Sequence, residues 1–353
     1  MNRFQENVAA LPNYTVDQDL SRIKLNQNES PRDVPQPFKE EIWRKLVTRS
    51  WNRYPPAQNR SLEERLSAYS GFPASGILIG NGSNELILTL LIAACGQGGS
   101  VLTVKPGFSI YKRMAGLLPA RLIEVPLNGD FSFDLQAILE RAGDARLVFL
   151  ASPNNPTGTA LAPEEIGMIA GRTEGFLVVD EAYYEFSGRT VQTLIGEKEN
   201  IVVLRTFSKA WRLAGARLGY LLGREELVRQ AAKVRLPFSV SLFAQAAAEV
   251  MLDHRDELAR SCREIREERD GVFQALKKIR GIVPVPSSAN FILFSAADRA
   301  AAVLHKQLRD RGVEVRVFDD PALEKHLRVT IGTAAENSAF LSALRDIMKE
   351  ARL

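Results

Sequence analysis

FLVVDEAYYEF (Phe176–Phe186) and IVVLRTFSKAWRLAGARLGYLLG (Ile201–Gly223) are the stretches that decide the fold. Each begins with a short, continuous apolar run, which is typical of a strand buried on both faces of a sheet. The first run ends at Asp180, and the second leads into Thr206, Ser208 and Lys209. In a parallel sheet such strand ends lie together at the edge where ligands bind.

Further apolar runs on both sides extend this pattern into repeated β-α units. We expect strands at Ile77–Ile79, Val101–Val104, Arg121–Val125, Leu147–Leu150, Phe176–Val179, Ile201–Leu204 and Leu218–Leu222, with helices between them such as Glu85–Ala94 and Glu164–Ala170. This order predicts an α/β fold in which a mostly parallel central sheet is flanked by helices.

The C-terminal part has a different pattern and predicts a smaller α+β domain. We expect a long helix from about Ser241 to Lys278, strands near Phe291–Phe294, Val313–Val317 and Leu327–Ile331, and a last helix at about Ala335–Glu350. The expected division is an N-terminal arm or lid at 1–40 that contributes to the small domain, a large domain at 41–250 and a small domain at 251–353.

The composition excludes several classes of protein. Two cysteines, outside any CxxC pair, and three scattered histidines among 353 residues indicate neither a disulfide framework nor a metal site. A net charge of +4 does not indicate nucleic-acid binding and suits anionic small substrates. The N-terminus lacks the pattern of a signal peptide, and the longest apolar stretch is too short to cross a membrane, so we expect a cytoplasmic protein.

Lys209 is the candidate for covalent chemistry. A lone lysine carries little weight because most lysines are exposed, but this one follows a strand among small and hydroxyl side chains. A desolvated lysine can form imines. Thr206, Ser208 and Arg217 would supply donors to a phosphate.

Two other strand ends carry candidate polar groups. Asp180 could hold a ring nitrogen protonated, although an acidic residue there can also be a solvated turn residue. Tyr183 could reach the oxygen of the same ring. Asn155 lies in SPNNPTG, which read alone is a tight turn.

GNGSNEL (Gly80–Leu86) places a Gly/Asn/Ser turn directly before a helix. The free N–H groups of that helix terminus form a natural phosphate site, to which Ser83 and Asn84 would contribute. The alternative is that Ser83 or Asn84 is only the N-cap, and the two interpretations are compatible.

Together these motifs resemble the class I/II aminotransferases of fold type I along essentially the whole chain. The resemblance rests on LNQNES at Leu25, RYPP at Arg53, GNGSNEL, SPNNPTG, DEAYYEF, TFSKAWRLAGARLGY, SSANFIL at Ser287 and LRVTIG at Leu327. It is strongest to the branch that acts on histidinol phosphate. Two positions depart from the family pattern: Asn84 replaces the usual Asp, and Ser30 intervenes before Pro31.

The resemblance implies the cofactor pyridoxal 5'-phosphate, held covalently by Lys209. It implies that Asp180 pairs with the ring nitrogen, that Tyr183 and Asn155 bind the ring oxygen, and that Phe108 stacks on the ring or is simply core. The phosphate would be bound by Ser83, Asn84, Thr206, Ser208 and Arg217, and by Tyr54 of the partner in a homodimer with composite sites.

The substrates implied are a small amino donor and a 2-oxo acid acceptor. Arg328 would bind the substrate anion, because a guanidinium grips a carboxylate or a phosphate through two hydrogen bonds. Arg316 would add a second contact, and Tyr14 would either do the same or anchor the N-terminal arm. The resemblance implies no metal, nucleic acid or membrane partner.

Three rival functions are compatible with parts of this pattern. One is an aminotransferase for aromatic or other amino acids, and another is a decarboxylase of phosphothreonine-like substrates with the same fold. The third is a cofactor domain acting as a regulator, but the presence of Lys209, Asp180 and Arg328 together counts against it.

Overall fold

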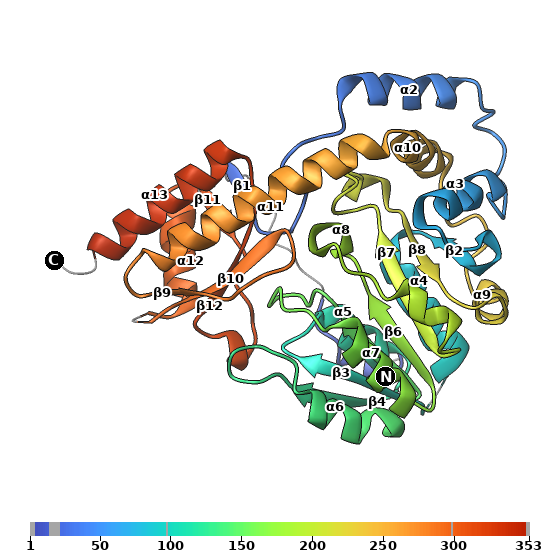
Figure 1. Ribbon diagram of the computed structural model, residues 1–353, viewed down its shortest axis with the longest axis horizontal. Helices are drawn as coiled ribbons and strands as arrows, with labels where there is room; N and C mark the ends of the chain where they lie inside the picture. Colours follow the sequence, from blue (N-terminus) through green and yellow to red (C-terminus); the bar gives the residue numbers. More distant parts are fainter. Residues whose placement is uncertain (1–3, 14–21, 97, 298, 351–353) are drawn as a thin grey trace.

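The computed structural model describes residues 4–13, 22–96, 98–297 and 299–350. Seven strands form the main sheet: β2 (Ile77–Gly80), β3 (Ser100–Lys105), β4 (Arg121–Pro126), β5 (Leu147–Ala151), β6 (Phe176–Asp180), β7 (Ile201–Thr206) and β8 (Gly219–Leu222). Their order is β2-β8-β7-β6-β5-β3-β4, and β8 alone runs antiparallel to its neighbours. The predicted α/β fold with a mostly parallel central sheet is therefore confirmed (Figure 1).

Both faces of this sheet are buried because successive side chains alternate between two apolar clusters. In β5, Val148 and Leu150 belong to one cluster, and Leu147 and Phe149 belong to the other. The second face is covered by α4 (Gly82–Leu90), α5 (Ser109–Leu117) and α9 (Glu225–Ala232). The first is covered by α3 (Arg60–Ser70), α6 (Leu135–Arg141), α7 (Pro163–Arg172) and α10 (Leu242–Asp253).

A second group of elements lies beside the main sheet. The antiparallel sheet β12-β10-β9 is formed by β9 (Ile282–Pro284), β10 (Phe291–Ala296) and β12 (His326–Thr330), and packs with α12 (Ala301–Asp310) and α13 (Ala334–Glu350). The helix α11 (Arg255–Lys277) runs from the main sheet to this group (Figure 1).

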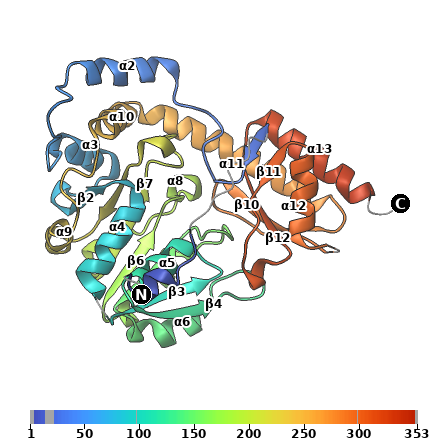
Figure 2. The same ribbon diagram turned by 180° about the vertical axis from the view of Figure 1, so that it is seen from behind.

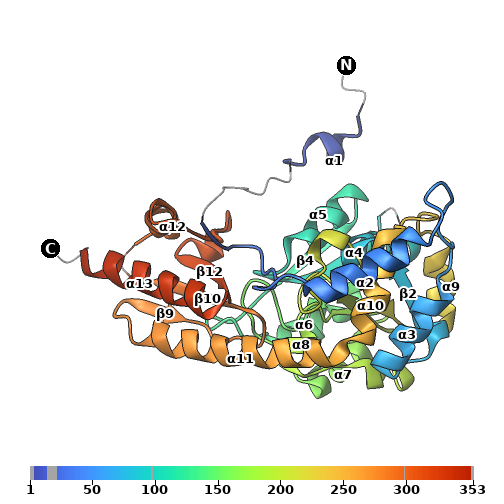
Figure 3. The same ribbon diagram turned by 90° about the horizontal axis from the view of Figure 1, so that it is seen from above.

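The N-terminal residues contact both groups. The strand β1 (Ile23–Leu25) pairs in parallel with β11 (Val313–Val315), among the C-terminal elements (Figure 2). The short helix α1 (Glu6–Ala9) lies against α5 instead (Figure 3), where the Asn7 amide donates to the Gly116 and Leu117 carbonyls. The chain then continues through α2 (Gln36–Val47), which packs on α10.

The long helix expected from Ser241 to Lys278 is wrong, since α10 and α11 are separate helices. His254 lies between them with φ −105° and ψ 31°, outside the helical region. Its ring stacks on Phe38 at a centroid distance of 3.9 Å, and its Nε2 lies 2.9 Å from a Glu41 carboxylate oxygen. The interruption between α10 and α11 is therefore accompanied by contacts of His254 with α2, and no pattern in the nearby sequence predicts these contacts.

Smaller differences concern element ends. The helix expected at Glu85–Ala94 begins at Gly82 and continues after Leu90 as a π-helical turn, η2 (Leu91–Cys95). Short 3-10 turns occupy η1 (Ala74–Gly76), η3 (Ala142–Asp144), η4 (Gln192–Gly196), η5 (Ala214–Ala216) and η6 (Pro321–Leu323), and α8 (Tyr184–Ser187) is a single helical turn. Among the described residues no helix is long and apolar enough to span a membrane.

Candidate active site

Asp180 ends β6 at the carboxyl edge of the sheet and is almost fully buried, with 3% of its surface exposed. Its Oδ2 accepts a hydrogen bond from the Tyr111 hydroxyl at 2.7 Å, and its Oδ1 accepts one from the Ala182 N–H at 3.0 Å. Burial raises the pKa of Asp180, while these two hydrogen bonds act in the opposite direction. A cation placed beside this carboxylate would therefore be strongly favoured.

Lys209 follows β7 at the same edge. Its Nζ donates to the Gln27 carbonyl at 2.9 Å and lies 6.0 Å from the centre of the Tyr183 ring. Burial lowers the pKa of Lys209 to about 8, and the positive charge of Arg328 acts in the same direction. About a tenth of this amine is therefore neutral, and nucleophilic, at pH 7.

A cradle for a small anion lies at the start of α4. Asn81 holds the N-cap position and makes no side-chain cap, so neither Ser83 nor Asn84 is the N-cap; both lie in the first helical turn. Gly82 has φ +73°, and a Cβ on it would come within 2.8 Å of Arg217 Nη2. The open space left by this glycine brings the guanidinium close to the helix terminus.

The other donors predicted for this anion surround the same guanidinium. Arg217 itself is in the left-handed region at φ 57°, and its Nη1 donates to Ser208 Oγ at 3.4 Å. The Ser208 N–H donates to Thr206 Oγ1 at 3.1 Å. A Cβ on Gly219 would come within 2.5 Å of the Ser83 nitrogen, so glycine is required there for β8 to approach α4.

Arg328 lies on β12 and reaches the main sheet from the C-terminal group. Its Nη1 donates to Asn155 Oδ1 at 2.6 Å, and its Nη2 donates to the Asn26 carbonyl at 2.7 Å. With its oxygen accepting from Arg328, Asn155 presents its amide N–H groups as donors to a further partner. Phe291 and Phe318 flank the guanidinium at 5.2 and 5.7 Å.

Arg316 stands opposite Arg328 in the backbone. The two residues exchange both backbone hydrogen bonds at 2.9 Å as an isolated antiparallel bridge. Residues paired in this way project their side chains on the same face, so two cationic side chains share one surface. Since like charges in this arrangement repel, the pair is suited to an anion.

The remaining predicted residues are placed differently from one another. Tyr183 is buried and its hydroxyl accepts from Asn28 Nδ2 at 2.9 Å. Phe108 is half-buried and packs edge-to-face on Tyr111 at 5.4 Å. Tyr54 is 81% exposed and stacks on Phe238 at 4.7 Å, so within one chain it is not part of this cluster. Tyr14 lies outside the described residues.

The sequence interpretation missed Tyr111 and Asn28, which hold Asp180 and Tyr183. Tyr111 lies in the first turn of α5, and in the sequence it is indistinguishable from an apolar core residue. Asn28 belongs to LNQNES, one of the stretches that carry the family resemblance, but nothing in that stretch indicates that its side chain contacts Tyr183. The burial of both side chains, with 1% of their surfaces exposed, depends on contacts with residues that are distant along the chain.

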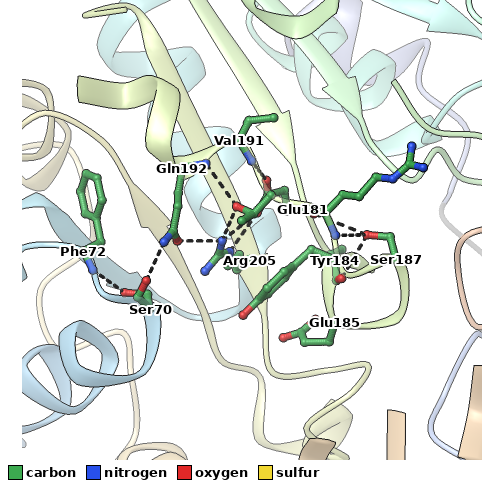
Figure 4. Close-up of polar contacts among 12 residues, drawn as sticks. Ser70, Phe72, Glu181, Tyr184, Glu185, Ser187, Val191, Gln192 and Arg205 are labelled. Atoms are coloured by element: carbon green, nitrogen blue, oxygen red, sulfur yellow. Dashed lines mark hydrogen bonds and ion pairs between the residues drawn. The ribbon is translucent and has the colours of Figure 1, made fainter. Parts of the chain in front are cut away.

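A buried ion pair between Glu181 and Arg205 supports the strand ends from the opposite face of the sheet (Figure 4). Both side chains are 1% exposed, with 2.9 Å between Arg205 Nη2 and Glu181 Oε2. The same Nη2 donates to Thr190 and Gln192, and the Tyr184 ring lies 3.8 Å from the guanidinium carbon. A charged residue inside the run IVVLRT was the available sequence signal, because a buried arginine needs a partner.

Each member of this pair is adjacent in sequence to a residue of the candidate site. Glu181 follows Asp180, and Arg205 precedes Thr206. Because side chains alternate along a strand, the ion pair lies behind the sheet while Asp180 and Thr206 lie in front. The pair thus fixes the ends of β6 and β7 relative to each other without entering the site.

Comparison with known proteins identifies relatives of the whole chain. The sequence pattern of the family described as aminotransferase class I and II matches residues 21–344. The chain is 41% identical over 343 residues to the histidinol-phosphate aminotransferase of Thermococcus kodakarensis, covering 97% of this chain and 98% of the relative. The enzyme of the same name from Chlorobium chlorochromatii is 37% identical over 336 residues, covering 94% and 92%.

A solved structure has the same fold over its full length. The crystal structure of histidinol-phosphate aminotransferase from Sinorhizobium meliloti in complex with pyridoxal-5'-phosphate superposes with a TM-score of 0.90. It is 26% identical, and the match covers 99% of each chain.

Replacing Arg205 with Met should lower the free energy of unfolding by about 3–5 kcal/mol, because Glu181 would stay buried without its cation. The double variant Glu181→Gln, Arg205→Met should recover much of this loss, and urea unfolding would measure both. Arg229→Met, which breaks the exposed ion pair with Glu226, is the matched control and should have little effect. A double variant no more stable than Arg205→Met would contradict this account.

In the cofactor-free protein, Lys209 should react with an amine-acylating reagent at a rate that rises with pH, with an inflection near pH 8. Its pKa is lowered from the ordinary lysine value, so the reactive neutral amine predominates from that pH upward. Peptide mapping by mass spectrometry after timed labelling would give the profile. Arg328→Gln removes a neighbouring positive charge and should move the inflection to higher pH. An inflection of the unaltered protein near that of a free lysine would be evidence against a perturbed amine.

Proposed function

Because the chain belongs to the class I and II aminotransferases, we propose that it transfers the amino group of histidinol phosphate to 2-oxoglutarate, a step of histidine biosynthesis. The names of relatives at 37–41% identity over more than nine-tenths of the chain support this substrate. The observation that carries the proposal is a buried lysine of lowered pKa on which the charges of the buried Asp180 and of Arg328 act, with Arg316 paired to Arg328 through the backbone. Histidinol phosphate and 2-oxoglutarate are both anionic, as that arginine pair requires.

The residues of the site fit pyridoxal 5'-phosphate, the cofactor of this chemistry. Asp180 is a buried acceptor suited to a protonated ring nitrogen, and Tyr183 and Asn155 offer polar groups for the ring oxygen. Phe108 adds an aromatic surface next to Tyr111. The cradle formed by the first turn of α4 (Ser83 and Asn84) with Thr206, Ser208 and Arg217 matches a phosphate in charge and donors.

When bound, the cofactor supplies an electron sink for the carbon that loses a proton. Lys209 would anchor the cofactor. Once the substrate amine has displaced it, the Lys209 amine would move a proton from the substrate α-carbon to the cofactor carbon. A pKa of about 8 suits an amine that must act first as a base and then as an acid. Asp180 keeps the ring nitrogen protonated, and Tyr111 holds that carboxylate in place.

Substrate recognition is assigned to Arg328, with Arg316 and Tyr14 in support. The guanidinium of Arg328 is already oriented by Asn155 and Asn26, so little conformational freedom is lost when it grips an anion. The planar set of N–H donors on this guanidinium can bind a phosphate ester and a carboxylate alike. One pocket can therefore take both the amino donor and the oxo-acid acceptor in turn.

The proposed assembly is a homodimer in which Tyr54 reaches the phosphate of the partner's cofactor. Its ring is almost fully exposed and stacks on Phe238, and further exposed apolar side chains lie on α2, the following loop, residues 236–238 and the start of α10. These side chains are Trp43, Val47, Trp51, Leu236, Phe238 and Phe243. An exposed aromatic surface of this kind is typical of a protein interface, and a twofold dimer would cover it in both subunits.

The domain division and location are proposed on separate grounds. The parts at 41–250 and 251–353 contain the main sheet and the C-terminal sheet respectively, and β1 of the N-terminal arm at 1–40 pairs with β11. Cys95 and Cys262 are both free thiols, as is usual in the reducing cytoplasm.

Histidinol phosphate and glutamate should each be converted to their oxo products by the cofactor-loaded protein, and Lys209→Ala should convert neither. Mass spectrometry of the products after a single turnover would detect this. Borohydride reduction should fix the cofactor on the peptide that contains Lys209.

Adding phenylalanine and phosphothreonine to these two substrates separates the rival functions. Rapid conversion of phenylalanine with none of histidinol phosphate would remove the proposed substrate and leave the aminotransferase. Release of CO₂ from phosphothreonine would instead indicate a decarboxylase. A protein that binds the cofactor and converts none of these would be consistent with a regulator.

Tyr54→Ala and Lys209→Ala variants, each inactive alone, should regain activity when mixed under conditions that exchange subunits. A mixed dimer would contain one site with both groups intact, giving up to about a quarter of the normal activity if subunits pair at random. Size-exclusion chromatography with differently tagged chains would verify exchange. Exchange without recovery would show that each site is built from one chain.

A further inference from the structure

Asn28 lies where three distant parts of the chain meet, and its side chain is 1% exposed. Its Nδ2 donates to the Tyr183 hydroxyl at 2.9 Å, on the main-sheet side. On the side of the C-terminal sheet, its backbone N–H donates to Thr330 Oγ1 at 2.9 Å, and its carbonyl accepts from Asn290 Nδ2 at 3.2 Å. Backbone and side chain of Asn28 are therefore both held.

The Thr330 hydroxyl determines which end of the Asn28 amide faces Tyr183. It accepts from the backbone N–H of Asn28 and donates its single hydrogen to Asn28 Oδ1 at 3.3 Å. With the amide oxygen bound in this way, the amide N–H groups point to Tyr183. The hydrogen bond between Asn28 and Tyr183 thus has a fixed direction.

A phenol has one hydrogen to donate, and the Asn28 contact places a donor against its oxygen. The hydrogen of Tyr183 must therefore point to some other acceptor. We infer that Asn28 is a positioning residue that makes Tyr183 a hydrogen-bond donor to the ring oxygen of the bound cofactor. This inference rests on the proposed function, since it needs the cofactor in the site.

The surroundings of Tyr183 agree with a donor role. Burial raises the pKa of Tyr183, which keeps the phenol protonated. The residues next to Asn28 contact the other groups of the site: the Gln27 carbonyl accepts from Lys209, and the Asn26 carbonyl accepts from Arg328. One short segment thereby orients the amine, the guanidinium and the phenol together.

Two substitutions distinguish the effect of the Asn28 side-chain donor from the effect of its backbone conformation, which is left-handed at φ 55°. Asn28→Asp keeps the shape and tolerates this conformation but offers an acceptor, so Tyr183 should donate to it and not to the ring. Asn28→Gly keeps the conformation with no side chain and is the backbone control.

The measurement is the pH at which the bound cofactor changes colour, followed by absorbance, together with the cofactor dissociation constant. In Asn28→Asp the colour change should move upward by about one pH unit, a tenfold change in proton affinity, because the ring oxygen loses a donor that stabilises its anion. The dissociation constant should rise by about tenfold for the loss of one hydrogen bond. Asn28→Gly should give a smaller upward shift, because Tyr183 is freed there but not turned away.

A double-mutant cycle with Tyr183→Phe tests whether Asn28 acts through the phenol. In the Phe background, Asn28→Asp should add little further shift. An equal shift in both backgrounds would show that the introduced carboxylate acts by its charge or through the fold, and would overturn the inference, as would no shift at all.

Thr330→Val provides a second route if Asn28→Asp does not retain the cofactor. It leaves Asn28 intact but removes the hydroxyl that fixes its amide, so a smaller upward shift is expected, again only when Tyr183 is present. An unaltered protein that develops no cofactor absorbance would instead refute the proposed function, which is a different outcome from an unmoved colour change.

Discussion

Burial of both faces of the seven-stranded sheet is the constraint on which the rest of the structure depends. A polar side chain within such a sheet is costly unless it is paired, so polar groups gather where the strands end. Asp180 and Thr206 lie at two such ends, and Lys209 is three residues after Thr206. The ion pair that does enter the buried strands, Arg205 with Glu181, has hydrogen-bond partners on both side chains. The cost of burying polar groups therefore places the site at the sheet edge. The same cost requires that the ion pair behind the site be hydrogen-bonded.

The site depends equally on segments that are remote in sequence. Residues 26–28 lie between the main sheet and β12, and their polar groups contact Lys209, Arg328 and Tyr183. A buried segment without regular pairing would leave its backbone groups unsatisfied, and the functional side chains satisfy them here. Binding of any ligand to Lys209 or Arg328 must therefore compete with, or be directed by, this segment.

The sequence predicts those features that have a local physical cause. Continuous apolar runs predict buried strands, and their ends place Asp180 and Lys209 at one edge without knowledge of the tertiary structure. Contacts that depend on how distant elements pack have no such signature: nothing near Tyr111 indicates that its hydroxyl meets Asp180, and nothing near His254 indicates that α2 takes up its side chain. The opposition of Arg316 and Arg328 depends in the same way on a register that the sequence does not encode locally.

The charges around Lys209 link the two ends of the site. Burial is the largest effect that lowers the pKa of this amine. The charges of Arg328 and Arg217 lower it further, while those of Asp180 and Glu29 raise it. An anion bound by either arginine would partly cancel that arginine's field at Lys209 and so favour the protonated amine. Because such linkage is reciprocal, protonation of Lys209 also tightens anion binding at both ends. In a site arranged in this way, anion binding raises the proton affinity of Lys209, so the amine becomes a stronger base when the substrate is held and can remove its proton, which is the first step required of it.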